Sequence, residues 1–422
     1  MKKIAALRKK GVGIVAAVLI MLIVGVMGAT MASLSGDNSM SSVNYFKSQQ
    51  AFFLAESGVQ RALYEVSKGG GAWAGWSGTD PKTIQQTLTG YGDYDISIAA
   101  PASKTPVITA KGYVPGRSAA GRAVRVVTFT AKGINLFGQY AGFANGSSGG
   151  NGIVVTMVGS SLTDSYDSSI GPYNVSGNKG SDGNIGTNAD ISTAGSAHIY
   201  GNVTTGPAGT FNDQSDVSGT ITHDSNVVLP AVVVPPLLLN CTAGCTNGGS
   251  ISLTGSGAQT IPSGNYQYSK ISATGSAVVT IVGPANIYIT GSTSLKTTGS
   301  AQIAVSAAST GPVIIYFAGN VDTAGSGIVN NSTIPSNFQL YGSSTSSQDV
   351  KLTGSAAFYG VVYAPHGDVS LAGSSGSYGS FIGDELSLVG SSAIHHDVNL
   401  ANMTLPSFMS NTWQVSGWKE VY

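Results

Sequence analysis

An uncharged run from Val12 to Leu34 constrains this chain more than any other feature of its sequence. At ~1.5 Å rise per residue, a helix of that length covers roughly 34 Å, enough to cross a bilayer core of ~30 Å. Five basic residues precede the run: Lys2, Lys3, Arg8, Lys9 and Lys10. Because positive charge stays in the cytoplasm, we expect a single-pass inner-membrane protein with an extracytoplasmic domain. A removed secretory signal is the alternative, but its apolar region would be shorter.

The apolar pattern continues beyond this run. Large apolar side chains recur at roughly helical spacing at Val43, Phe46, Phe53, Val59, Leu63 and Val66. Three glycines, Gly69 to Gly71, then end any helix. The sequence therefore predicts one membrane-spanning and amphipathic helix over residues 12–67. The polar segment Ser35–Ser42 is its weak point, because a break there would make the apolar run a simple tether.

Two parts of this region resemble a known family. Lys9-Lys10-Gly11 before an apolar helix resembles a type IV prepilin leader over residues 1–11, which implies cleavage between Gly11 and Val12 by a prepilin peptidase, and methylation. Gln50 to Ala62 is similar to the N-terminal helix of PilX-type minor pilins. The resemblance implies other pilin or pseudopilin subunits as partners, a pilus or cell-surface location after assembly, and an assembly helix that includes Phe52, Phe53, Ala55, Glu56 and Gly58.

The chain departs from major pilins at one position. Major pilins carry a Glu at the fifth mature position, and this chain has Ala16 there. In pilins that carboxylate is thought to neutralise the N-terminal amine of the subunit ahead. A subunit at the filament tip has no such amine to neutralise, so Ala16 favours a tip location. An ordinary membrane-tethered surface protein is the alternative.

Residues 72–139 predict a small pilin-like β region. Residues 94–99, 107–113 and 123–131 are rich in β-branched and aromatic side chains, and turn signals separate them. We expect a short antiparallel sheet that covers the inner face of the helix. Residues 401–422 end in a strand-like tail, which is expected either to join this sheet or to cap the region before it.

A short repeat dominates residues 140–400. Its core is Gly-Ser followed by a small residue, and it begins at Gly159, Gly195, Gly255, Gly275, Gly299, Gly325, Gly354, Gly373 and Gly390. A period near 20 residues with strand-like segments between the glycines predicts a β-solenoid in which each coil stacks on the next. The expected fold class is thus mostly β: an N-terminal long helix with a small pilin-like sheet, then a β-solenoid. A β-sandwich with Gly-rich turns is the alternative.

This region also resembles an uncharacterised domain of bacterial surface proteins. The matching segments are Asp164–Ser168, Gly360–Pro365 and Ile394–Asp397. The resemblance implies a β-helical, non-catalytic surface module without a named ligand.

The remaining chemistry is sparse. Cys241 and Cys245 predict a local disulfide rather than a metal site in an exported chain. The best polar clusters are His395-His396-Asp397 and His366-Gly367-Asp368, which we interpret as turn or surface residues. We expect no enzyme and no cofactor. Calcium is the one ion considered, on the oxygens of Asp164, Asp167, Asp182, Asn184, Asn188 and Asp190.

Charge narrows the partners further. Residues 140–400 hold four lysines and 13 acidic residues, which excludes a nucleic-acid partner. The sequence favours a minor pilin-like subunit of a type IV pilus or type II secretion-like filament. A membrane-anchored adhesin for a surface or glycan is the alternative, and an exported β-helix enzyme acting on polysaccharides is a weaker third hypothesis.

Overall fold

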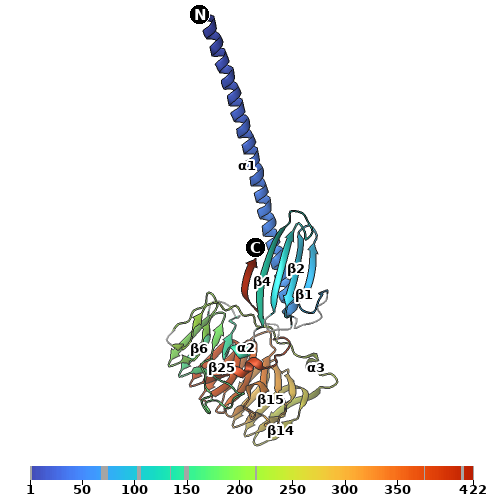
Figure 1. Cartoon of the computed structure of the whole chain (residues 1–422). Helices are drawn as coiled ribbons and strands as arrows, with labels where there is room; N and C mark the ends of the chain where they lie inside the picture. Colours follow the sequence, from blue (N-terminus) through green and yellow to red (C-terminus); the bar gives the residue numbers. More distant parts are fainter. Residues whose placement is uncertain are drawn as a thin grey trace. The chain divides into compact units, whose positions relative to one another are not determined.

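The computed structural model describes residues 2–67, 75–101, 106–133, 135–146, 152–213, 216–374, 376–409 and 413–421 (Figure 1). The chain divides into two compact units. Unit 1 comprises residues 1–132 and 415–422, and unit 2 comprises residues 133–414. Because unit 1 contains both ends of the chain, unit 2 is an insertion within it.

Unit 1 is a long helix packed on an antiparallel sheet. Helix α1 runs from Lys2 to Ser67 without a break at Ser35–Ser42. The strands are β1 (Lys82–Leu88), β2 (Gly92–Ala99), β3 (Val107–Val114), β4 (Ala123–Gly133) and β28 (Trp413–Val421), and they are ordered β1-β2-β3-β4-β28. The three strands expected from the sequence are confirmed as β2, β3 and β4. The C-terminal strand β28 lies beside β4 and completes the sheet (Figure 1).

The expected membrane span is wrong. Among the described residues, no helix is both long enough and apolar enough to cross a membrane. Gly25, Thr30 and Ser33 dilute the larger apolar side chains of α1 where the structure describes them. The side chains of residues 12–20 lie outside the described part. This finding overturns the membrane-spanning element of the expected fold class and the single-pass inner-membrane localisation.

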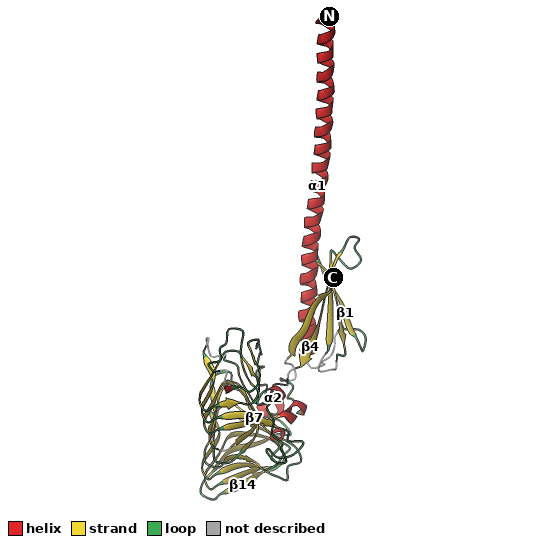
Figure 2. Cartoon of the chain, turned by 60° about the vertical axis from the view of Figure 1, so that its left-hand side comes forward, coloured by secondary structure: helices red, strands yellow, loops and turns green. Residues whose placement is uncertain are grey.

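Unit 2 is almost entirely parallel β-structure (Figure 2). Its first part contains α2 (Leu136–Gln139), β5 (Gly142–Ala144), β6 (Ile153–Gly159), β7 (Leu162–Tyr166), β8 (Ile185–Thr187), β9 (Asp190–Gly195), β10 (His198–Ile199), β11 (Val203–Thr204) and β12 (Ile221–Thr222). A connecting segment with α3 (Pro236–Leu239) follows.

The second part is longer. It contains β13 (Thr246–Leu253), β14 (Ala258–Ile261), β15 (Gly264–Gly275), β16 (Val278–Ile281), β17 (Ala285–Ile289), β18 (Thr293–Gly299), β19 (Gln302–Val305), β20 (Val313–Phe317), β21 (Asn320–Thr323) and β22 (Gly327–Asn330). It ends with η2 (Pro335–Asn337), β23 (Phe338–Gly342), β24 (Gln348–Thr353), β25 (Phe358–Gly373), β26 (Gly376–Gly390), β27 (Ala393–Asp397) and η3 (Val398–Asn402).

The coils do not stack in chain order, so the expected solenoid of successive coils is wrong. The late strand β26 pairs in parallel with the early strands β5 and β6, and β27 pairs with β7. From this junction the early strands continue through β8 and β11 to β12. The late strands extend the other way, back to β13. The chain thus starts in the middle of the stack, builds one half, and returns from the opposite end.

The Gly-Ser repeat forms one corner of this stack. All nine repeat glycines lie on a single ladder, ordered in space 255-275-299-325-354-373-390-159-195. The serine after the glycine commonly donates its backbone N–H to the glycine carbonyl of the adjacent coil, as from Ser160 to Gly390 at 2.8 Å. Most of these glycines have positive φ, for example +81° at Gly275, which favours glycine over other residues.

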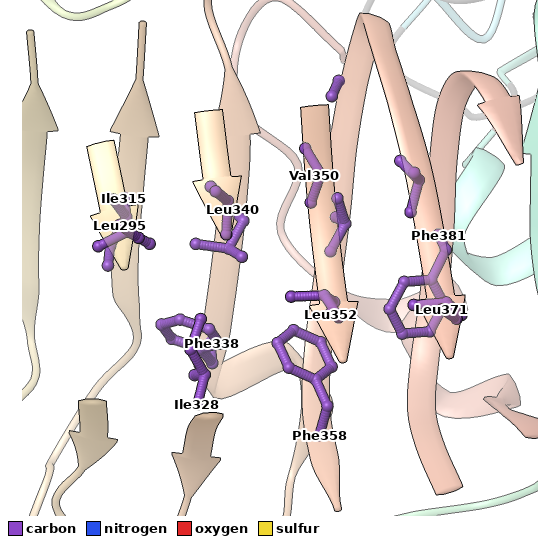
Figure 3. Packing of buried hydrophobic residues seen from close by; sticks show 14 of the residues in the cluster. Leu295, Ile315, Ile328, Phe338, Leu340, Val350, Leu352, Phe358, Leu371 and Phe381 are labelled. Carbon is purple, nitrogen blue, oxygen red and sulfur yellow. The ribbon is translucent and has the colours of Figure 1, made fainter. Parts of the chain in front are cut away.

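Aliphatic ladders fill the interior of the stack. One ladder passes through both halves of unit 2, and its members are Ile271, Leu295, Val321, Val350, Val369, Leu386, Val155 and Ile191. Figure 3 shows neighbouring members of this core, including Phe338, Phe358 and Phe381. Identical positions in successive coils therefore bury side chains of similar kind, which is how a stack of parallel strands makes a continuous core.

A second apolar layer covers one outer face of the stack. The tyrosines Tyr288, Tyr316, Tyr341 and Tyr363 occupy the same position in successive strands. The connecting segment, residues 226–240, packs on this ladder through Val234 and Leu238, and the Tyr363 hydroxyl donates to the carbonyl of Pro230 at 2.6 Å. We call residues 226–240 the strap. It links the last strand of one half, β12, to the first strand of the other, β13.

Candidate functional site

The first candidate site is the part of α1 that packs on the sheet of unit 1. Ala51, Leu54, Ala55, Val59, Ala62 and Val66 are buried there. Gly112 on β3 allows the closest approach, because a Cβ at this position would lie 1.9 Å from the Ala51 carbonyl oxygen. Small residues on both sides therefore let the helix backbone rest directly on the strands.

The residues expected to form an assembly helix divide between two faces. Ala55 and Gly58 are buried against the sheet, where a Cβ on Gly58 would meet Ala110 at 3.2 Å. Phe53 is exposed, and Glu56 is half-buried. Phe52 is half-buried and makes an edge-to-face contact with Trp418 of β28. Thus Ala55 and Gly58 hold the helix on its own sheet, and Phe53 remains available to another molecule. Gly11 and Val12, the predicted cleavage site, lie outside the described side chains.

An arginine ties the three parts of unit 1 together. The Arg125 guanidinium on β4 donates to the Ser48 hydroxyl of α1 at 2.7 Å and lies 3.3 Å from the Glu420 carboxylate of β28. The C-terminal strand is therefore bound to the sheet by charge as well as by strand pairing.

The N-terminal half of α1 has a different surface. Between residues 21 and 46 the large apolar side chains that the structure describes are exposed, and they include Met21, Leu22, Val24, Val26, Met27, Met31, Met40, Val43 and Phe46. Met21 and Phe46 are 74% and 71% exposed. Burial of apolar surface is favourable by roughly 25 cal/mol of free energy per Å², so this segment favours contact with another apolar surface.

The second candidate site is a buried polar cluster in unit 2. Asp164 on β7 is fully buried, and His395 on β27 is its partner in the parallel register. The His395 Nδ1 lies 2.5 Å from Asp164 Oδ1. The Tyr173 hydroxyl donates to Asp164 Oδ2 at 2.6 Å, and the Lys179 ammonium lies 3.2 Å from the same oxygen. The buried Asp164 carboxylate thus contacts three polar side chains.

Aromatic rings surround this carboxylate. The His395 ring contacts Tyr173 and Tyr378, with ring centroids 3.8 and 4.7 Å away, and these two tyrosine rings also contact each other at 5.7 Å. Tyr359 then stacks on Tyr378 at 4.3 Å. Burial raises the pKa of the Tyr378 hydroxyl to about 12, so this ring stays neutral at physiological pH. The cluster lies where β27 meets β7, the junction between the two halves of unit 2.

The interpretation of His395, His396 and Asp397 as turn or surface residues is wrong, because all three are buried on β27. Asp164 and His395 belong to separate motifs, and no pattern links Tyr173 or Lys179 to either. The neighbouring His396 is buried, with its ring nitrogens each 2.8 Å from a carbonyl oxygen, of Asp182 and of Phe137. Asp397 accepts from the backbone N–H of Ser168 and of Asn399. Burial raises the pKa of the Asp397 carboxyl and lowers the pKa of the His396 imidazole.

The candidate calcium residues are engaged by protein donors. Asn184 Oδ1 accepts from the backbone of Asn202, Asn188 Oδ1 from Ser225 and Val227, and Asp190 Oδ1 from Thr210. Among the described residues, no group of three or more His, Cys, Asp or Glu side chains could hold a metal ion. These polar side chains instead bridge adjacent coils.

The remaining predicted polar positions lie apart from the cluster. Cys241 and Cys245 form a disulfide within the turn that follows the strap and precedes β13. His366 and Asp368 lie on β25, where burial and the neighbouring carboxylates of Glu385 and Asp384 raise the pKa of Asp368. The structure therefore does not bring the two His-containing motifs together at one site.

Comparisons with known proteins give little beyond this description. Residues 233–403 are similar to a family described as "Domain of unknown function (DUF7305)". No curated protein matches the chain. The crystal structure of the competence-associated pilin ComZ from Thermus thermophilus aligns over 89% of this chain and 98% of that chain, with 11% identity and a TM-score of 0.32. A TM-score this low establishes neither a shared fold nor a shared function.

Proposed function

We propose that this chain is a structural, non-catalytic subunit of a pilin-like filament, in which α1 packs against the helices of other pilin subunits. The exposed apolar segment of α1, residues 21–46, carries this proposal. The same helix buries one face of residues 51–66 on its own sheet, so two segments of α1 have separate roles. One segment anchors the helix to unit 1, and the other offers apolar surface for assembly.

The finer form of the proposal is a PilX-type minor pilin at the tip of a type IV pilus or type II secretion-like filament. It is supported by the prepilin-like leader and by Ala16 in place of the Glu of major pilins. Cleavage between Gly11 and Val12 would expose a new N-terminus. Mass spectrometry of the protein purified from its native host tests this step. A mature chain beginning at Val12 supports it, and one beginning near residue 33 contradicts it.

Filament incorporation tests the proposal directly. Filaments sheared from native cells should contain the wild-type chain. Phe46→Glu, which places a charge in the exposed apolar segment, should reduce its amount in the sheared fraction at least about tenfold, the effect of ~1.4 kcal/mol per contact. Gln60→Glu is the matched control, because Gln60 is exposed on the sheet-packed half of the same helix. Incorporation of the Phe46→Glu chain at the wild-type level would overturn the proposal.

A further inference from the structure

We propose that Lys179 and Asp164 form an intramolecular isopeptide bond, a covalent cross-link of unit 2 in addition to the Cys241–Cys245 disulfide. The Lys179 Nζ lies 3.2 Å from Asp164 Oδ2, so the amine lies beside the carboxyl group whose Cγ it would attack. The proposal concerns the buried cluster of unit 2 and does not depend on the role of α1.

The backbone holds the two side chains in place. Residues 167–178 form a loop, and its ends are joined by an antiparallel bridge between Ser165 and Gly180, with N–H···O distances of 3.2 and 2.7 Å. Asp164 and Lys179 directly flank this bridge. Inside the loop, the buried Asn178 side chain bonds the backbone of Asp167 and of Gly171. Such fixed geometry replaces a bimolecular encounter, and effective molarities of about 10⁵–10⁸ M have been measured for well-oriented groups.

Burial and aromatic rings surround the two reacting groups. Asp164 is 0% exposed, and the Lys179 ammonium lies 5.9 and 5.6 Å from the ring centroids of Tyr173 and Tyr200. The Lys179 side chain is still 44% exposed, which leaves a path for the water that the reaction releases.

The proposed step balances without a co-reactant. After proton transfer, the neutral Lys179 Nζ attacks Asp164 Cγ and forms a C–N bond. The bond from Cγ to Oδ1 then breaks, and this oxygen leaves as water. The two protons on that water come from the original ammonium group, and His395, whose Nδ1 contacts Oδ1, relays one of them. The Tyr173 hydroxyl, which donates to Oδ2, stabilises the charge on the oxygen that remains.

The bond would close the loop onto β7, next to the junction of the two halves. Tyr173 in the loop stacks on His395 of β27, and Asp164 belongs to β7. A covalent link from Lys179 to Asp164 would keep Tyr173 over His395 when the stack is pulled or heated. A surface-displayed domain gains resistance to unfolding from such a link, because it restricts the unfolded chain as other cross-links do.

Intact mass spectrometry of the full chain, with its disulfide reduced, tests the proposal. The wild-type mass should be lower than the sequence mass by one water, and trypsin should fail to cut after Lys179. Lys179→Arg is the matched control, because it keeps the positive charge and the loop but lacks the amine nucleophile. This variant should have its full sequence mass.

Two further results decide the roles. His395→Gln should slow cross-linking and give a mixture of the two masses, while its circular dichroism spectrum matches that of the wild type. A full wild-type mass with normal cleavage after Lys179 would overturn the proposal and leave a simple ion pair. An equal mass deficit in the Lys179→Arg chain would also overturn it, because the lost water would then come from elsewhere.

Discussion

At the scale of single residues, the corner glycines of unit 2 carry two separate constraints. Gly159 has φ of +89°, and a Cβ there would lie 2.6 Å from the carbonyl oxygen of Gly390 in the adjacent coil. Gly255 has φ of +63°, but a Cβ there would meet no heavy atom within 4 Å, because this glycine begins the ladder. The two positions therefore separate backbone strain from coil packing.

Alanine substitution tests this separation. Gly255→Ala should lower the free energy of unfolding by about 1–2 kcal/mol, the cost of a left-handed conformation for an L-residue. Gly159→Ala should cost about 1–3 kcal/mol more, because the new methyl group pushes two coils apart. Urea unfolding of both variants measures the difference. Equal losses would show that the ladder spacing does not constrain these corners.

His396 predicts a pH dependence for the same unit. Its ring is buried, and burial lowers the pKa of the imidazole, although hydrogen bonds to the carbonyls of Phe137 and Asp182 oppose the shift. The pKa of this ring is lower in the folded protein than in the unfolded chain, which binds a proton below about pH 6.5. The stability that this residue contributes is therefore present above that pH and is lost as the pH falls.

Thermal melting between pH 8 and pH 5 would reveal this effect. The melting temperature of the wild type should fall toward the acid end, and His396→Gln should flatten that fall. His366→Gln is the control, because His366 is only partly buried. An unchanged slope in the His396→Gln chain would assign the acid sensitivity to other groups.

At the scale of elements, the strap is an outer layer and not part of the coil core. Leu238 of α3 is buried against the tyrosine ladder, whereas its neighbour Leu239 is 49% exposed. Leu238→Ala should lower the free energy of unfolding by about 2–3 kcal/mol through lost burial and a residual cavity. Leu239→Ala should change it by no more than about 0.5 kcal/mol. Chemical denaturation compares the pair, and similar values for both would mean that the strap is loosely packed.

The sequence predicted these elements unevenly, for physical reasons. The Gly-Ser repeat marked all nine corner positions. Each corner needs a small residue, and the residue after it commonly donates its backbone N–H to the adjacent coil. The repeat could not reveal the order of the coils. All its copies look alike, so nothing in the sequence shows that Gly159 and Gly390 are neighbours in space. Strands β2, β3 and β4 of unit 1 were predicted because they pair with their neighbours in the sequence, whereas β1 was not predicted. The cluster of Asp164 and His395 was not predicted, because only the long-range register joins residues 231 positions apart.

At the scale of the whole molecule, the boundary of a folding unit differs from the boundary of sequence similarity. The similar segment, residues 233–403, contains the late strands but not β5 to β12. In the structure, β26 and β27 are covered by β5, β6 and β7. A fragment limited to 233–403 would therefore expose the backbone N–H and C=O groups along one side of two long paired strands.

Expression of two fragments tests this boundary. Residues 133–414 form a compact unit with both edges of the junction paired, so this fragment should be monomeric and melt in one cooperative transition. Residues 233–403 should self-associate, because unpaired strand edges pair with other chains. Size-exclusion chromatography with light scattering distinguishes the two cases. A monomeric, cooperatively melting 233–403 fragment would mean that the late strands fold without the early ones. The early half would then be an addition to the stack, whereas the shared aliphatic ladder from Leu386 to Val155 indicates one core.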